Sequence, residues 1–219
     1  MVKGCMSNLH LWDLNNIKSM DQRFRAQFIN SLPGFKTPFL LGTQNSSGET
    51  NLSIVSSVTH IGSNPALMSL IMRPNTVPRH SIENIKETNF FTLNAVPKDR
   101  YVDAHQTSAR YDRDQSEFDH CNFTAVYEKD FNAPFVAESP LQIGLSLAQI
   151  NHLEINGCDM VIGKIEMVKA PFKIMGEDGA LKLDQLNLCS VTGLDCYHSH
   201  QKIGRLSYAK PDKKPSVID

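Results

Sequence analysis

The segment from Leu141 to Leu153 constrains the fold most strongly, because leucine or isoleucine stands at every second position from Leu141 to Leu147. The positions between them hold Gln, Gly and Ser. This period of two is typical of a β-strand with two different faces. Gly157 then supplies a turn before a second apolar segment, 160–168. We therefore expect the two segments to form a long antiparallel hairpin.

Five shorter segments are also typical of strands, namely 39–43, 52–61, 66–72, 90–96 and 122–126. The turn-forming runs Asn45–Gly48 and Gly62–Pro65 join the first three segments as hairpins. Helices are expected only at 19–31, with Ser19 as N-cap, at 81–87 and at 99–109. Many strands and few helices predict a mainly β fold, an antiparallel β-barrel with a few short helices, whose closure removes exposed sheet edges.

A single domain accounts for the whole chain, residues 1–219, because this length fits one core and no segment looks like a linker. We expect residues 1–18 to form an irregular N-terminal arm that Trp12 attaches to the body. Residues 210–219 hold two prolines and three lysines, so we expect a mobile tail.

The composition argues against several classes of partner. Hydrophobic residues make up 41% and charged residues 21%, and the formal net charge is −1, so no strong field attracts nucleic acid or an anionic membrane. No apolar segment approaches the roughly 18 residues of a membrane span, and the start lacks a signal-peptide core. We expect a cytoplasmic protein without nucleic-acid or membrane partners.

Metal binding is not expected from the cysteines or histidines. The five cysteines are scattered without a Cys-x-x-Cys pair, which favours reduced thiols over structural zinc. His198 and His200 would share one face of a strand, but no third ligand follows at a recognised spacing. His105 lies in an expected helix, where it could face either solvent or a bound ligand.

The stretch Gly48–Asn84 carries polar side chains that fit an anionic ligand. These are Asn51, Ser53, Ser56 and Ser57 in or beside an apolar strand, and Arg73, Arg79, His80 and Ser81 where segment 66–72 gives way to a helix. The free N–H groups and the dipole at a helix N-terminus both favour a phosphate. The alternative is that the serines only face solvent on a half-buried strand.

The order of these residues resembles the flavin reductase-like family, which consists of FMN-binding split-barrel proteins. The family pattern is an Asn, a Ser five residues on, an Asn-Pro-Pro turn, and Lys-Asp-Thr followed by Asn-Ile. The matching residues here are Asn51, Ser56, Asn64-Pro65, Arg79-His80-Ser81 and Asn84-Ile85, and Ala66 replaces the second Pro. The likeness continues through 116–118, 135–140 and 163–165 and covers residues 35–210.

The resemblance implies an FMN cofactor in a homodimer, bound at the subunit interface, with electrons or hydride arriving from NAD(P)H. Arg79 and Ser81 would then hold the phosphate, with Arg73 and His80 close by. Asn51, Ser53, Ser56 and Ser57 would meet the ribityl chain and the pyrimidine edge. Because the flavin does the chemistry, no catalytic side chain is expected.

One segment departs from the family pattern. Many flavin reductases carry Gly-Asp-His before the strand that ends in Gly-Glu-Val, and that His is thought to face the nicotinamide. Here the corresponding residues are Gly157, Cys158 and Asp159, and His152 lies on the preceding strand. The sequence therefore leaves open a second function, an FMN-binding or electron-transfer module that does not oxidise NAD(P)H directly.

Overall fold

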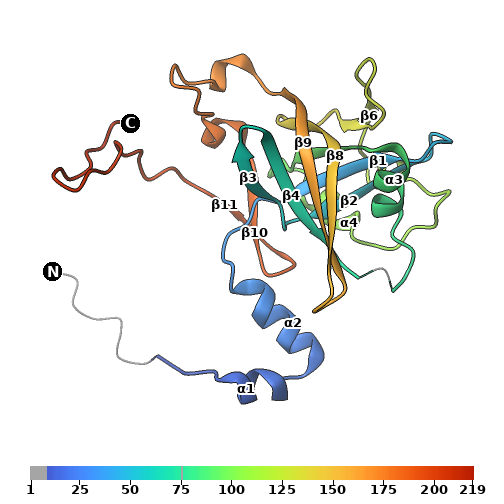
Figure 1. Ribbon diagram of the computed structural model, residues 1–219, viewed down its shortest axis with the longest axis horizontal. Coiled ribbons are helices and arrows are strands. Elements are labelled where there is room, and N and C mark those ends of the chain that lie inside the picture. Colours follow the sequence, from blue (N-terminus) through green and yellow to red (C-terminus); the bar gives the residue numbers. More distant parts are fainter. Residues whose placement is uncertain (1–8, 75) are drawn as a thin grey trace.

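The centre of the computed structural model, which describes residues 9–74 and 76–219, is a seven-stranded antiparallel sheet (Figure 1). Its strand order is β2-β1-β5-β8-β9-β4-β3. The strands are β1 (Phe39–Gln44), β2 (Thr50–Val55), β3 (Thr59–Ser63), β4 (Ala66–Met72), β5 (Phe90–Ala95), β8 (Gln142–Leu153) and β9 (Cys158–Lys169). The mainly β class is confirmed, and β2 and β3 remain as two edges, so the barrel is split.

Short helices and two small sheets surround this sheet. The helices are α1 (Leu14–Ser19), α2 (Gln22–Ser31), α3 (His80–Thr88), α4 (Tyr101–Gln106) and α5 (Glu117–His120), with 3-10 turns η1 (Phe172–Ile174) and η2 (Leu183–Leu186). The small sheets pair β6 (Ala125–Val126) with β7 (Phe135–Val136), and β10 (Cys189–Thr192) with β11 (Cys196–Ser199). The hairpin β10–β11 was not foreseen from the sequence.

The prediction of one strand over 52–61 is wrong. The chain leaves the sheet after Val55 and re-enters it at Thr59 on the opposite edge, so β2 and β3 are separate strands. The crossing segment is tied down by Ser57, whose Oγ donates to the carbonyl of Ile71 (3.1 Å) and accepts from its N–H (3.0 Å). A serine side chain therefore replaces backbone pairing at the split between the two edges.

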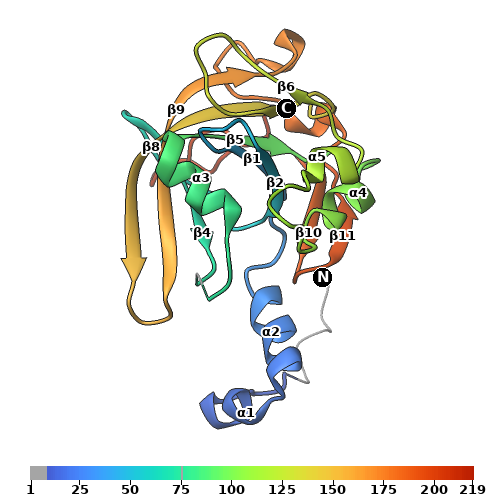
Figure 2. The same ribbon diagram turned by 90° about the vertical axis from the view of Figure 1, so that its right-hand side faces the viewer.

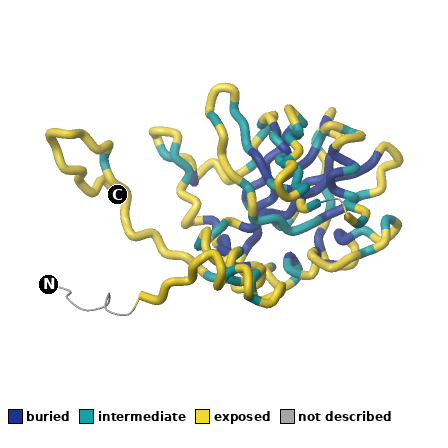
Figure 3. The backbone as a smooth tube through the Cα atoms, turned by 60° about the horizontal axis from the view of Figure 1, so that its bottom comes forward, coloured by how far each residue is buried: buried dark blue, intermediate teal, exposed yellow. Residues whose placement is uncertain are grey.

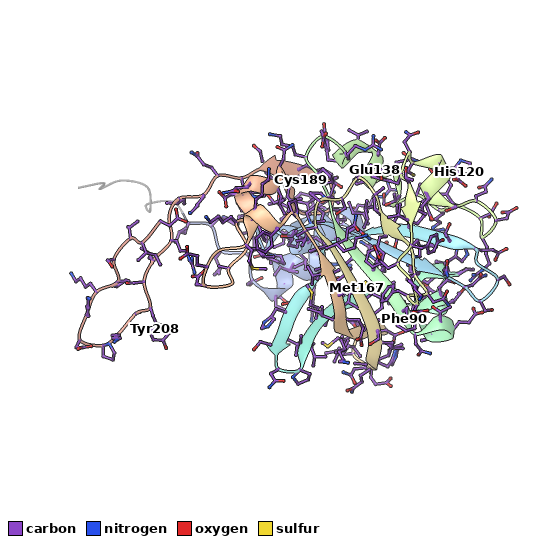
Figure 4. All side chains as sticks on the ribbon, turned by 90° about the horizontal axis from the view of Figure 1, so that it is seen from above. Phe90, His120, Glu138, Met167, Cys189 and Tyr208 are labelled. Atoms are coloured by element: carbon purple, nitrogen blue, oxygen red, sulfur yellow. The ribbon has the colours of Figure 1, made fainter. Side chains whose placement is uncertain are left out.

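The hairpin of β8 and β9 is confirmed, and its alternating residues build the core. Ile143 and Leu145 are buried in the main apolar cluster with Phe91, Leu93 and Val161. The opposite face of β8 is covered as well, because Gly144 lies against the rings of Phe131 and Phe135 and against Met167. Figure 4 shows Met167 and Phe90, which pack in this second cluster.

The N-terminal residues form helices rather than an irregular arm. Asp13 caps α1 in a reciprocal bond with Asn16, and Asp21 caps α2, where the sequence had suggested Ser19. Asp21 is the N-cap because its carboxylate accepts hydrogen bonds from two free N–H groups of the first turn. Residues 1–8 of the expected arm lie outside the described residues. Figure 2 shows both helices standing away from the sheet.

The C-terminal tail also leaves the body, as the exposed ring of Tyr208 illustrates (Figure 4). It turns back on itself, because Leu206 pairs with Val217 and the N–H of Arg205 donates to the carbonyl of Asp219 (2.8 Å). An ion pair between Arg205 and Asp178 connects the tail to the body. The mobility expected for 210–219 remains a prediction.

Candidate functional site

Three of the predicted polar residues meet where β2 faces the start of α3. Asn51 and Ser53 point to the same side of β2, because they are two residues apart on a strand. Asn51 Nδ2 donates to Ser81 Oγ (2.9 Å), and Ser53 Oγ is hydrogen bonded to the same atom (2.9 Å). Asn51 and Ser81 are buried. The hydroxyl of Ser81 therefore connects β2 to α3.

The N-terminus of α3 carries Arg79 as its N-cap residue. The backbone N–H of Arg79 donates to Glu83 Oε1 (3.1 Å), so the side chain of Glu83, one turn further along α3, orders the start of the helix. The side-chain Nε of Arg79 is buried and has no hydrogen-bond partner within residues 9–74 and 76–219. A buried donor without an acceptor costs free energy, so this nitrogen fits an acceptor that a ligand would bring.

A second arginine, Arg113, reaches α3 from the loop before α5. It makes an ion pair with Glu83 and donates to Asn84 Oδ1 (3.2 Å). Asn84 is buried, and its Nδ2 donates to Thr43 Oγ1 (3.2 Å) on β1. Sequence reasoning missed Arg113, because the charged segment around it looked exposed and nothing local indicates its partner.

The outer edge of β2 is closed by the segment that begins α5. Glu117 is buried, and its Oε2 accepts from the N–H of Leu52 (2.9 Å). Ser116 Oγ is hydrogen bonded to Thr50 Oγ1 (2.6 Å). Burial raises the pKa of the Glu117 carboxyl, and the bond from Leu52 lowers it by less. These contacts hold in place the strand that carries Asn51 and Ser53.

The other residues that the sequence predicted are not part of this hydrogen-bonded cluster. Ser56 is half-buried in the crossing segment, and the hydroxyl of Ser57 is already used by Ile71. His80 is half-buried in the first turn of α3, and Arg73 is exposed. The geometry thus brings together Asn51, Ser53 and Ser81.

A protein-family model described as the flavin reductase like domain matches residues 32–179 of this chain. The chain belongs to the flavin reductase-like family. No curated protein sequence matches it. A Shewanella frigidimarina NCIMB 400 structure, assigned as a flavin reductase with a split barrel domain, is 47% identical with a TM-score of 0.88. That match covers 92% of this chain and 100% of the other.

Two more distant structures share the fold. Nitrilotriacetate monooxygenase component B from Bacillus cereus is 16% identical, with a TM-score of 0.79 over 91% of this chain and 100% of that one. The FMN-binding protein from Thermus thermophilus is 14% identical, with a TM-score of 0.60 over 75% and 85% of the two chains. At these identities the likeness concerns the split-barrel fold alone.

The segment that departs from the family pattern contains Asp159, which is paired with a histidine of the neighbouring strand. His152 and Asp159 stand opposite each other in the β8–β9 ladder, and His152 Nδ1 lies 2.8 Å from Asp159 Oδ1. Lys86 of α3 lies 3.8 Å from the other carboxylate oxygen of Asp159. An imidazole therefore stands beside position 159 of this flavin reductase-like chain, although it comes from the neighbouring strand.

Two other histidines singled out in the sequence, His105 and His198, have local partners, whereas His200 is exposed just after β11. His105 Nδ1 is hydrogen bonded to the hydroxyl of Tyr197 (3.0 Å), and burial raises the pKa of Tyr197 to about 12. His198 Nε2 is hydrogen bonded to Thr192 Oγ1 (2.9 Å). Across residues 9–74 and 76–219, no three His, Cys, Asp or Glu side chains gather as metal ligands. Within the same ranges, no helix is long and apolar enough to span a bilayer.

A hollow of about 540 Å³ lies at the end of β1. None of the residues predicted from the sequence to bind the cofactor lines it. Its lining residues are Gln44, Tyr127, Glu128, Asp130, Phe131 and Asn132.

Proposed function

We propose that this flavin reductase-like protein binds FMN with the phosphate at the N-terminus of α3. The observation that carries the proposal is the buried Nε of Arg79, which has no partner among the described residues and lies at a helix start. The dipole and the free N–H groups there favour an anion, and an arginine fork matches phosphate oxygens.

The residues around Arg79 have complementary roles in this proposal. Ser81 offers its hydroxyl to the phosphate end, while Asn51 and Ser53 hold that hydroxyl in place. Ser56 and Ser57 border the ribityl chain, and Ser57 contributes through its backbone because its hydroxyl already bonds with Ile71. His80 and Arg73 stand near the same anion.

The proposed activity is redox transfer through the bound flavin. The flavin would supply the ring that accepts a hydride or electrons, and the protein binds and orients it. We propose NAD(P)H as donor, a homodimer as the working unit and a cytoplasmic location. No side chain is assigned as a catalytic residue, because none is needed to move a proton between protein and ring in this scheme.

A second function is favoured by the replaced segment Gly157–Asp159. Asp159 places a carboxylate where the family pattern has an imidazole, and His152 is already hydrogen bonded to it. The imidazole of His152 is therefore engaged by Asp159 and is not free to hold a nicotinamide. The chain would then be an FMN-binding electron-transfer module whose flavin is reduced by another donor.

The absorbance spectrum of the purified protein tests the cofactor proposal. We expect a flavin band, or its recovery when the colourless protein is titrated with FMN. Parallel titrations with FAD and riboflavin rank the three flavins, and FMN should bind most tightly. A protein that FMN cannot saturate would refute the proposal.

A further inference from the structure

Helix α2 presents its polar side to its own body and its apolar side to solvent. Gln27 Nε2 donates to Asp195 Oδ2 (3.0 Å) in the turn of the β10–β11 hairpin. Ser31, one helical turn further, lies close to Gly193 in the same turn. Lys36 Nζ then donates to the carbonyl of Gly193 (3.0 Å). The base of the helix is therefore anchored to the body by polar contacts.

The apolar stripe of α2 consists of Phe24, Phe28 and Leu32, which follow one another at spacings of four residues. Such residues share one face of a helix. Phe24 and Leu32 are 62% and 64% exposed, and α2 has no buried residue. Phe28 is partly covered by Trp12, whose ring lies 5.5 Å from it between centroids. An amphipathic helix normally buries this face, so here its partner is missing from residues 9–74 and 76–219 of the single chain.

The exposed apolar area extends along the whole described part of the N-terminal segment. Eight large apolar side chains between residues 9 and 35 are exposed, and they are Leu9, Leu11, Trp12, Leu14, Phe24, Ile29, Leu32 and Phe35. Figure 3 shows this segment projecting from the buried body as exposed chain. At roughly 150 Å² for each side chain, they present on the order of 1,000 Å². Monomeric proteins rarely expose a patch of that size.

We propose that residues 9–35 form an arm that docks on a second copy of this chain. A standard interface buries about 800 Å² per partner, so the arm alone reaches that size. Interfaces this apolar are characteristic of permanent homodimers rather than of transient complexes. A twofold axis lets each copy offer its arm to the other, so the contact closes on itself. The inference rests on the proposed homodimer but not on the proposed cofactor.

The test compares two double variants of the full chain by sedimentation velocity across the micromolar range. Phe24→Glu with Leu32→Glu places two charges on the stripe. Ala26→Glu with Asn30→Glu places the same charges on the opposite side of α2 and serves as control. We expect the stripe variant to raise the dimer dissociation constant at least about a hundredfold, and the control to remain dimeric like the wild type. Circular dichroism and a melting curve check that both variants fold.

Photo-crosslinking of a folded chain that carries benzoylphenylalanine in place of Phe24 gives a second readout. The inference expects a product of twice the chain mass. An internal crosslink at single-chain mass would overturn it, because the arm would then close on its own body. A stripe variant that dimerises like the wild type, a control that dissociates equally, or a monomeric wild type would also overturn it. Flavin titration is a separate measurement, so a negative result for the arm does not affect the cofactor proposal.

Discussion

His152 Nδ1 lies 2.8 Å from Asp159 Oδ1, directly across the β8–β9 ladder. The hydrogen bond that the imidazole of His152 donates to the Asp159 carboxylate raises the pKa of His152, and the nearby Glu154 carboxylate adds to the increase. Because the folded-state pKa lies above the unfolded one, the pair stabilises the fold fully below the ordinary histidine pKa. That contribution is lost as the pH rises through the raised value. The pair therefore keeps His152 protonated to a higher pH than an ordinary histidine.

Asp159→Asn should lower the pKa of His152, because the charged acceptor is lost. The imidazole proton shifts of His152, followed by NMR across the neutral range, measure this directly. Glu154→Gln is the matched control, since it removes a carboxylate that acts only at a distance and should lower the pKa by less. An unchanged pKa in the Asp159 variant would contradict the assignment of the partner.

If the chain has the second proposed function, that of an electron-transfer module, reduction of the FMN-loaded protein by NADH or NADPH should be slow, while dithionite reduces it normally. The imidazole that the family pattern has in this segment is missing here, and the loss of a positioning group commonly costs about a hundredfold in rate. Anaerobic stopped-flow absorbance measures the three reductants side by side. Asp159→His should accelerate nucleotide reduction, and Asp159→Asn separates loss of charge from gain of an imidazole. Fast reduction of the wild type would show that the replacement at residues 157–159 does not impair reduction of the flavin by the nucleotide.

Arg79→Ala should weaken FMN much more than riboflavin, which lacks the phosphate. A charge-assisted bond to phosphate is worth about 1.5–3 kcal/mol, or roughly tenfold to a hundredfold in affinity. Fluorescence titration with both ligands measures the ratio. Arg110→Ala, which removes an exposed cation, should leave both affinities nearly unchanged. Equal losses of FMN and riboflavin would mean that Arg79 does not contact the phosphate.

Glu117→Gln should flatten the dependence of stability on pH. Burial raises the folded-state pKa of Glu117 above its unfolded value, so folding favours the protonated acid. The wild type therefore loses stability as the pH rises from the ordinary glutamate pKa to the raised one, and the loss is constant above that. Urea unfolding at a series of pH values measures the slope. Glu177→Gln, at an exposed position, should keep the wild-type slope.

Gly42→Ala should destabilise the fold by about 1–3 kcal/mol through overpacking. An added Cβ would collide with the backbone carbonyl oxygen of Pro134 and with Thr92 Oγ1, and the backbone cannot move aside cheaply. Gly62→Ala is the control, because its Cβ would meet one backbone oxygen at an ordinary 3.5 Å. Similar unfolding free energies for the two variants would contradict the packing described around β1.

The elements that follow from local pattern were predictable, and those that depend on distant partners were not. The alternation after Leu141 identified the long hairpin, because the residues of one strand alone show the period of two. The break at Ser56 and Ser57 was missed, since it depends on a bond to Ile71 in another strand. Arg113 was missed for the same reason, because only the fold places it beside Glu83.

The sheet order has a consequence for biosynthesis. The hairpin of β3 and β4 can form as soon as it is made, but the other side of β4 pairs with β9, so that Leu67 meets Lys164 and Met72 meets Asp159. More than a third of the chain is translated between these partners. During that interval one edge of β4 stays open, which is a template for wrong pairing between nascent chains. Such long-range closure also slows folding, so the β4–β9 ladder is the step at which a folding chain most needs protection.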